Sequence, residues 1–132
     1  MNFSRRVVVG MAVAVAAALP ALAHHSAAEW DMTKRISISG TAKVVQFRNP
    51  HGHLELSVTD AKGAVVNWDV ETSAMNLLMR RGWTPGRIKI GDKITITGHP
   101  HKSQPARLYM REIRLSDGTV FGDPTGQDKA LD

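Results

Sequence analysis

The chain has 132 residues, of which 17 are Lys or Arg, 12 are Asp or Glu, six are His and none is Cys. The lack of cysteine excludes a disulfide framework, a thiolate metal site and a lipid-anchoring cysteine. The length allows one domain with a single modest core and excludes a two-domain organisation.

The first 23 residues follow the pattern of a cleavable export signal. Two arginines precede an uncharged apolar run at 7–19, which Pro20 ends just before a small-x-small peptidase site at 21–23. The run is shorter than the roughly 20 apolar residues of a membrane-spanning helix, which disfavours the alternative of an uncleaved anchor. We therefore expect cleavage between Ala23 and His24, a periplasmic or secreted protein, and no stable membrane insertion afterwards.

Cleavage would leave residues 24–132. Because Arg5 and Arg6 are removed, 15 of the 17 basic residues and all 12 acidic residues remain, which gives a net charge of +3. Such mild basicity does not favour a nucleic-acid partner. We expect one domain at 24–121 that starts with a polar arm, followed by a loose polar tail at 122–132.

The strands are predicted from the alternation of apolar and polar residues. From Ile36 the apolar residues recur at every second position, and the phase changes between Gly40 and Val45, which predicts a bulge or bend in a long first strand. A turn at Asn49-Pro50 ends that strand. Further strands are expected at 53–59, 64–71, 93–98 and 107–115, with a short ending at Val120-Phe121.

A short helix is predicted between the third and fourth strands. Thr72 or Ser73 is expected to cap it, and Gly82 is expected to stop it after about Arg81. Three strands, a short helix and two strands are the element order of the five-stranded oligonucleotide/oligosaccharide-binding (OB) barrel. We therefore predict a mainly β fold, a small OB-like barrel with one short helix between strands three and four. A β-sandwich or another small barrel is the alternative, which the position of the helix disfavours.

Several short motifs of the chain occur together in one known family. They are His24-His25-Ser26 after the signal, Asn49-Pro50-His51, Val66-Asn67-Trp68, Arg80-Arg81-Gly82-Trp83, and Gly91-Asp92 followed by Gly98. Over essentially the whole mature chain these motifs resemble the small exported bacterial proteins catalogued as domain of unknown function 6152. The resemblance implies no activity, because that family has none established. His53 differs from what the family more often has at this position, so the resemblance does not imply a family-wide ligand pair there.

The six histidines form three close pairs, which are His24 with His25, His51 with His53, and His99 with His101. Residues two apart on a strand point to the same side, so His51 and His53 can offer two imidazoles to one ion, with Glu55 next along that face. Without cysteine, the available imidazole, carboxylate and amine ligands favour copper(II), zinc or nickel.

Cleavage before His24 would place a free α-amine beside the imidazole of the same residue. A metal displaces the amine proton near neutral pH, so both nitrogens can chelate one ion. This arrangement resembles the histidine-brace copper sites in its chemistry, but not in fold or family. We therefore predict a copper(II) or zinc site formed by His24, His25, His51 and His53. The alternatives are exposed histidines without a ligand, with His99 and His101 in a loop, and a pH-responsive role.

A second candidate surface surrounds the end of the predicted helix. Arg80 and Arg81 can contact an anionic glycan, a lipid headgroup or a phosphate, and Trp83 can contribute to the same ligand or partner face. The alternatives are favourable charges at a helix C-terminus, and a Trp83 that plugs one end of the barrel.

The sequence contains no nucleophile motif, glycine-rich phosphate loop or zinc-protease motif, so we do not predict an enzyme. No cofactor other than the metal is expected. The predicted function is an exported small protein that binds copper(II) or zinc. The alternative is a metal-free module that binds a glycan, a small periplasmic ligand or a partner protein.

Overall fold

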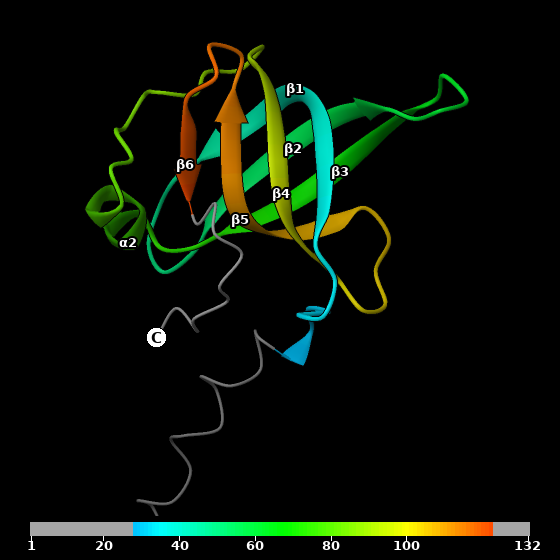
Figure 1. The fold of residues 1–132 in the computed structure, drawn as a ribbon, viewed down its shortest axis with the longest axis horizontal. Coiled ribbons are helices and arrows are strands. Elements are labelled where there is room, and N and C mark those ends of the chain that lie inside the picture. Colours follow the sequence, from blue (N-terminus) through cyan, green and yellow to red (C-terminus); the bar gives the residue numbers. More distant parts are fainter. Residues whose placement is uncertain (1–27, 123–132) are drawn as a thin grey trace, which may run out of the picture.

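The computed structural model describes residues 28–122, so the predicted export signal, His24, His25 and the tail beyond 122 lie outside the described residues. The described chain, shown in Figure 1, consists of β1 (Ile36–Gln46), β2 (Gly52–Thr59), β3 (Val65–Thr72), α2 (Met75–Arg80), β4 (Lys93–Pro100), β5 (Arg107–Leu115) and β6 (Val120–Gly122). Within residues 28–122, no helix is long and apolar enough to cross a membrane.

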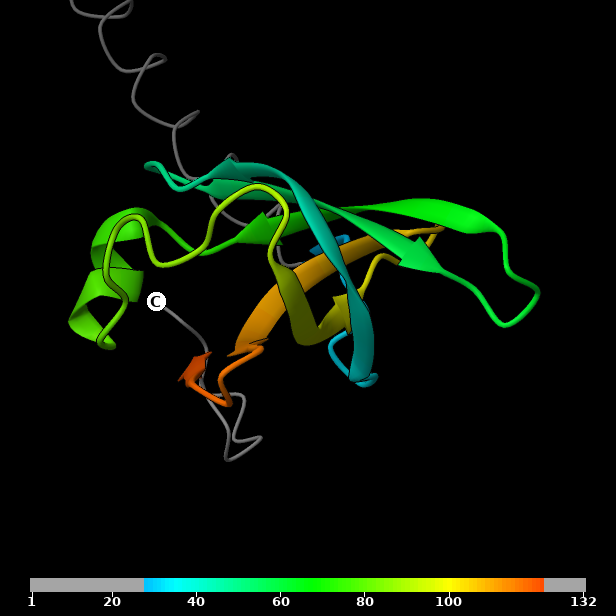
Figure 2. The ribbon, with the colours of Figure 1, turned by 90° about the horizontal axis from the view of Figure 1, so that it is seen from above.

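The strands close a mixed barrel. Antiparallel pairing joins β3 to β2, β2 to β1, β1 to β4 and β4 to β5, and parallel pairing of β3 with β5 closes the ring. Strand β6 adds an antiparallel edge to β5. A closed five-stranded barrel with a short helix between β3 and β4 is the predicted OB-like fold, which is therefore confirmed. Figure 2 shows α2 at one end of the molecule and the loop between β2 and β3 at the other.

Strand β1 bends because it pairs with two neighbours. Its first half pairs with β4 and its second half with β2, and the register shifts between Ala42 and Val44, so that Lys43 is the extra residue. A Cβ at Gly40 would lie 2.4 Å from the backbone oxygen of Ser57, so glycine permits this close crossing of β1 and β2. The predicted bulge in the first strand is confirmed.

The apolar side chains that alternate along each strand point inward and fill the barrel interior. Leu54 and Leu56 of β2 and Ile96 of β4 are completely buried, as alternation predicts. The other buried members of this cluster are Ile38, Ala42, Val70, Leu78, Trp83, Ile88, Ile94, Leu108, Met110 and Ile113. Removal of this apolar surface from water is the main term that favours the folded state.

The predicted cap of helix α2 is wrong. Thr72 and Ser73 are buried, and their hydroxyls bond the carbonyl of Ser73 (2.9 Å) and the hydroxyl of Tyr109 (3.1 Å) instead of the helix amides. The amide of Asn76 donates to Oδ1 of Asn49 (3.3 Å) in the loop after β1. A residue distant in the sequence therefore replaces a local cap, because the end of β3 is needed for barrel packing.

Candidate functional site

The outer face of β2 and β3 gathers histidines and carboxylates. Alternation along β2 places His53 and Glu55 outside, because the leucines between and beyond them fill the core. The antiparallel register pairs His53 with Glu71 and Glu55 with Asp69, so these four side chains share one face. His51 lies just before β2, two residues from His53, and its contact with Glu71 places it on this same face.

Each of these two histidines lies against a carboxylate of β3. His53 Nδ1 is 2.8 Å from Asp69 Oδ1, and His51 Nδ1 is 3.4 Å from Glu71 Oε1. Both imidazoles are partly exposed, and within residues 28–122 their Nε2 atoms have no hydrogen-bond partner. A neutral imidazole that donates from Nδ1 carries its free lone pair on Nε2. The carboxylates of β3 lie beside Nδ1 of both rings, which leaves Nε2 as the ring nitrogen open to a ligand.

Arg107 extends this contact chain to the neighbouring strand. Parallel pairing of β3 with β5 places it opposite Asp69, and its Nε lies 2.9 Å from Asp69 Oδ2 as an ion pair, off the angle of a hydrogen bond. Its Nη1 donates to Oε1 of Gln104 (2.8 Å), and its guanidinium carbon is 5.5 Å from the ring centre of Trp30. Asp69 thus contacts His53 with one oxygen and Arg107 with the other.

The N-terminal arm is held against the same edge of the barrel. Trp30 is buried, with its ring in a T-shaped contact with His101 (5.2 Å between centres) and 5.7 Å from the ring of Tyr109. The amide of Asp31 donates to the carbonyl of Pro100 (2.8 Å). These contacts anchor the start of the described chain beside β5.

The third histidine pair is occupied inside the protein. His99 is 1% exposed, its Nδ1 is 2.7 Å from the carbonyl of Lys34, and its Nε2 accepts from Arg111 Nε (3.2 Å). His101 Nδ1 accepts from the backbone amides of 103 and 104 (3.1 and 3.0 Å). The alternative that His99 lies in a loop is therefore wrong. Strand β4 continues to Pro100, so His99 lies within the barrel wall.

Trp83 is part of the core, so the predicted ligand face at the end of the helix is wrong for this residue. It is 4% exposed, and its ring lies 4.4 Å from that of Phe47 and 5.0 Å from that of Phe121. Trp83 therefore packs in the core with these two rings. Gly82, with φ of +89°, turns the chain after α2 so that Trp83 folds back, while Arg80 and Arg81 stay exposed.

Among residues 28–122, no group of three or more His, Cys, Asp and Glu side chains is arranged to hold a metal ion. His51 and His53 are brought together with two carboxylates, but His24 and His25 lie outside the described residues. A metal on this face would therefore need a further ligand from another part of the chain or from solvent.

Two arginines with contacts near the histidines carry no signal in the sequence pattern. Arg107 meets Asp69 only through the parallel pairing that closes the barrel, which no local pattern marks. Arg111 falls at the register shift between β4 and β5, where a period-two pattern cannot assign a face.

Comparison with known proteins places the chain as follows. A family of unknown function (DUF6152) matches residues 12–108. No curated protein matches the sequence. The similar solved structures include the following two. The mitochondrial single-stranded DNA binding protein Rim1 from S. cerevisiae has 9% identity and a TM-score of 0.48, covering 63% of this chain and 93% of that chain. The N-terminal domain of PriB from Thermoanaerobacter tencongensis has 14% identity and a TM-score of 0.45, covering 69% and 99%.

Proposed function

The chain belongs to the family of unknown function DUF6152, and we propose that it is an exported small protein that binds copper(II) or zinc on the outer face of β2 and β3. His51 and His53 supply two imidazoles through Nε2. The amine and imidazole of His24, freed by cleavage, complete the site, with His25 beside them.

The observation that carries this proposal is the pair of imidazole–carboxylate contacts. A histidine that binds a metal usually donates its other ring nitrogen to a carboxylate, which fixes the ring and raises its basicity. In this structure a carboxylate oxygen lies at ion-pair distance from Nδ1 of each ring, Asp69 beside His53 (2.8 Å) and Glu71 beside His51 (3.4 Å), on adjacent positions of one face. Zinc and copper(II) both accept such nitrogen ligands.

The N-terminal arm supports the completion of the site by His24. Trp30 packs beside β5, and β5 is separated from β2 by two strand spacings, about 10 Å. The four Cα–Cα steps from Ala28 back to His24 span up to about 14 Å when extended. The anchored arm is thus long enough for the α-amine to approach the face that carries His51 and His53.

The charges on this face support a cation over a nucleic acid. Glu55, Asp69 and Glu71 all belong to it, and within residues 28–122 only Asp69 is paired with a permanently charged side chain, Arg107. Carboxylates repel the phosphate backbone, which supplies most of the affinity in nucleic-acid binding. We therefore propose a metal ion as the ligand and no nucleic-acid partner for this face.

The test is titration of copper(II) and zinc into protein that begins at His24 and into a form with one extra Met before His24. Calorimetry gives the affinity, and electron paramagnetic resonance reports nitrogen ligands on copper. We expect the extra Met to weaken copper(II) binding by about tenfold or more, because it removes the chelate formed by amine and ring. Equal affinity of the two forms would overturn the role of the N-terminus.

The internal histidines are tested by His51→Ala and His53→Ala, with Val65→Ala as the matched control. The control changes an exposed side chain at the start of β3, at the end of the strand away from Glu71 and the two histidines. We expect each histidine variant to lose about tenfold or more in affinity and the control to change little. Unchanged affinity in the double histidine variant would overturn this face as the metal site.

A further inference from the structure

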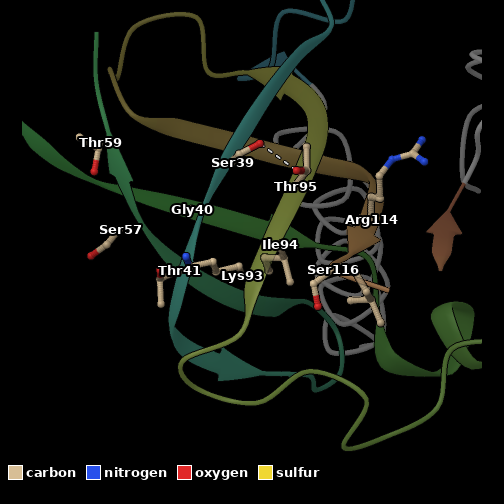
Figure 3. A pocket seen from close by; sticks show the side chains of 11 residues that line it. Ser39, Gly40, Thr41, Ser57, Thr59, Lys93, Ile94, Thr95, Arg114 and Ser116 are labelled. Atoms are coloured by element: carbon tan, nitrogen blue, oxygen red, sulfur yellow. Dashed lines mark hydrogen bonds between the residues drawn. The ribbon is translucent and has the colours of Figure 1, made fainter. Parts of the chain in front are cut away.

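A polar groove crosses the barrel beyond the histidine face. Its volume is about 430 Å³, and strands β1, β2, β4 and the end of β5 form its walls (Figure 3). Six of its lining residues carry hydroxyls, namely Ser39, Thr41, Ser57, Thr59, Thr95 and Ser116. Ser57 and Thr59 lie on the same outer phase of β2 as His53, but farther along the strand, and neither His51 nor His53 lines the groove.

The charge of this groove is positive. Lys93 and Arg114 line it, and no Asp or Glu among the described residues does. An adjoining hollow of about 350 Å³ shares Lys93 and adds Arg87 and Lys89.

The two carboxylates of the adjoining hollow are already engaged. Asp117 pairs with Arg87 (3.2 Å), and Asp92 Oδ2 accepts the amide of Lys89 (2.9 Å). Hydrogen bonds from Thr119 hold the pKa of Asp117 below its usual value, so this carboxylate stays ionised and bound to its partners at neutral pH. Arg114 Nη2 lies 3.5 Å from Glu112 Oε1 at the rim of the groove, and its side chain stays 56% exposed. Lys93 has no ion pair within residues 28–122, so it supplies the uncompensated positive charge that attracts an anion, with the exposed guanidinium of Arg114 beside it.

The hydroxyls that line the groove can form hydrogen bonds with the hydroxyls of a ligand. Ser39 and Thr95 share one hydrogen bond of 2.8 Å (Figure 3), which uses a single donor and leaves the other hydrogen and further lone pairs for a ligand. The hydroxyls of Thr41, Thr59 and Ser116 have no hydrogen-bond partner within residues 28–122. A ligand with alternating donors and acceptors, such as a polyol, matches this lining.

We propose that this groove binds a polyol that carries an oxyanion, that is, a sugar acid or a sugar phosphate. The hydroxyls bond the polyol, and Lys93 and Arg114 bind the carboxylate or phosphate. No aromatic ring lines the groove among the described residues, so it lacks the stacking platform that binds nucleobases.

The test uses nuclear magnetic resonance titration of the processed, metal-free protein with glucuronic acid, glucose 6-phosphate, glucose and inorganic phosphate. We expect at least one charged sugar to shift the amides of 39–41, 57–59 and 93–95, with glucose and phosphate about tenfold weaker. The stronger of the two charged sugars identifies the oxyanion. Equal binding of phosphate and glucose 6-phosphate, in the absence of glucuronic acid binding, would overturn the role of the hydroxyls.

Two variants test the residues. Lys93→Gln with Arg114→Gln is expected to weaken binding of the charged sugar by about tenfold or more, whereas Arg81→Gln at the exposed end of α2 leaves it unchanged. All three positions are exposed, so circular dichroism should show an intact fold. Unchanged binding in the double variant, shifts confined to other surfaces, or no binding of either charged sugar would overturn the proposal.

Discussion

His99 and Arg111 form a polar contact inside the wall of the barrel. Arg111 Nε donates to His99 Nε2 over 3.2 Å, so this ring nitrogen must be unprotonated, and Nδ1 is then the donor to the carbonyl of Lys34 at 2.7 Å. Both side chains are more than nine-tenths buried. A buried guanidinium is tolerated only where acceptors surround it, so His99 serves the stability of the fold and is not free for a ligand.

The first prediction concerns this histidine. His99→Leu keeps most of the side-chain volume but removes the acceptor of Arg111 and the donor to Lys34. We expect the free energy of unfolding to fall by about 2–5 kcal/mol, measured by urea denaturation. The same substitution at the exposed His51 should change it by no more than about 0.5 kcal/mol. Similar effects at both positions would show that the buried contact contributes little.

At the scale of the elements, two register shifts decide which side chains face the interior. The shift in β1 moves the inward phase from Ala42 to Val45, and the shift between β4 and β5 makes Arg111 the extra residue of β5. Helix α2 depends on the loop after β1 for an acceptor at Asn49. Each of these elements therefore depends on pairing or on a hydrogen bond from a neighbouring element, which is typical of short elements in small domains.

The second prediction concerns the turn that begins the described arm. Side-chain hydrogen bonds from Thr33 and Lys34 hold the pKa of Asp31 below 3.8. Because the folded pKa is lowered, the carboxylate contributes stability above pH 3.8, and this contribution is lost as the pH falls through the folded pKa. Asp31→Asn should therefore lower Tm at neutral pH, with a difference from the parent protein that shrinks in acid. Melting curves at several pH values check this, and a constant difference would contradict it.

At the scale of the whole molecule, the parallel pairing of β3 with β5 closes the barrel and also builds the candidate site. It places Val70 against Leu108 inside and Asp69 against Arg107 outside. The arm reaches this same edge through Trp30, which stacks near Arg107. The pairing that closes the barrel therefore also places Asp69 between His53 and Arg107.

The third prediction tests this closure. Leu108→Ala removes a completely buried side chain at the closing pair, and we expect it to cost about 2–5 kcal/mol in the free energy of unfolding. Val65→Ala, at a position 67% exposed on β3, is the control and should cost about 0.5 kcal/mol or less. If the two variants unfold at the same urea concentration, the β3–β5 seam is not a stabilising part of the barrel.

The sequence alone determined the strands, their inward phases and the order of elements, and from these the OB-like barrel. Alternation is a local property: Leu54 and Leu56 must lie opposite His53 and Glu55 wherever β2 is placed. The same property predicted that His51 and His53 share a side.

Only the tertiary structure decided which partners those side chains meet. The carboxylates beside the histidines come from β3, Arg107 comes from β5, and Trp83 turns inward because two distant rings surround it. His99 is buried because β4 runs on to Pro100 within the barrel wall. These contacts depend on strand register and barrel closure, which join residues far apart in the chain and leave no periodic trace in the sequence.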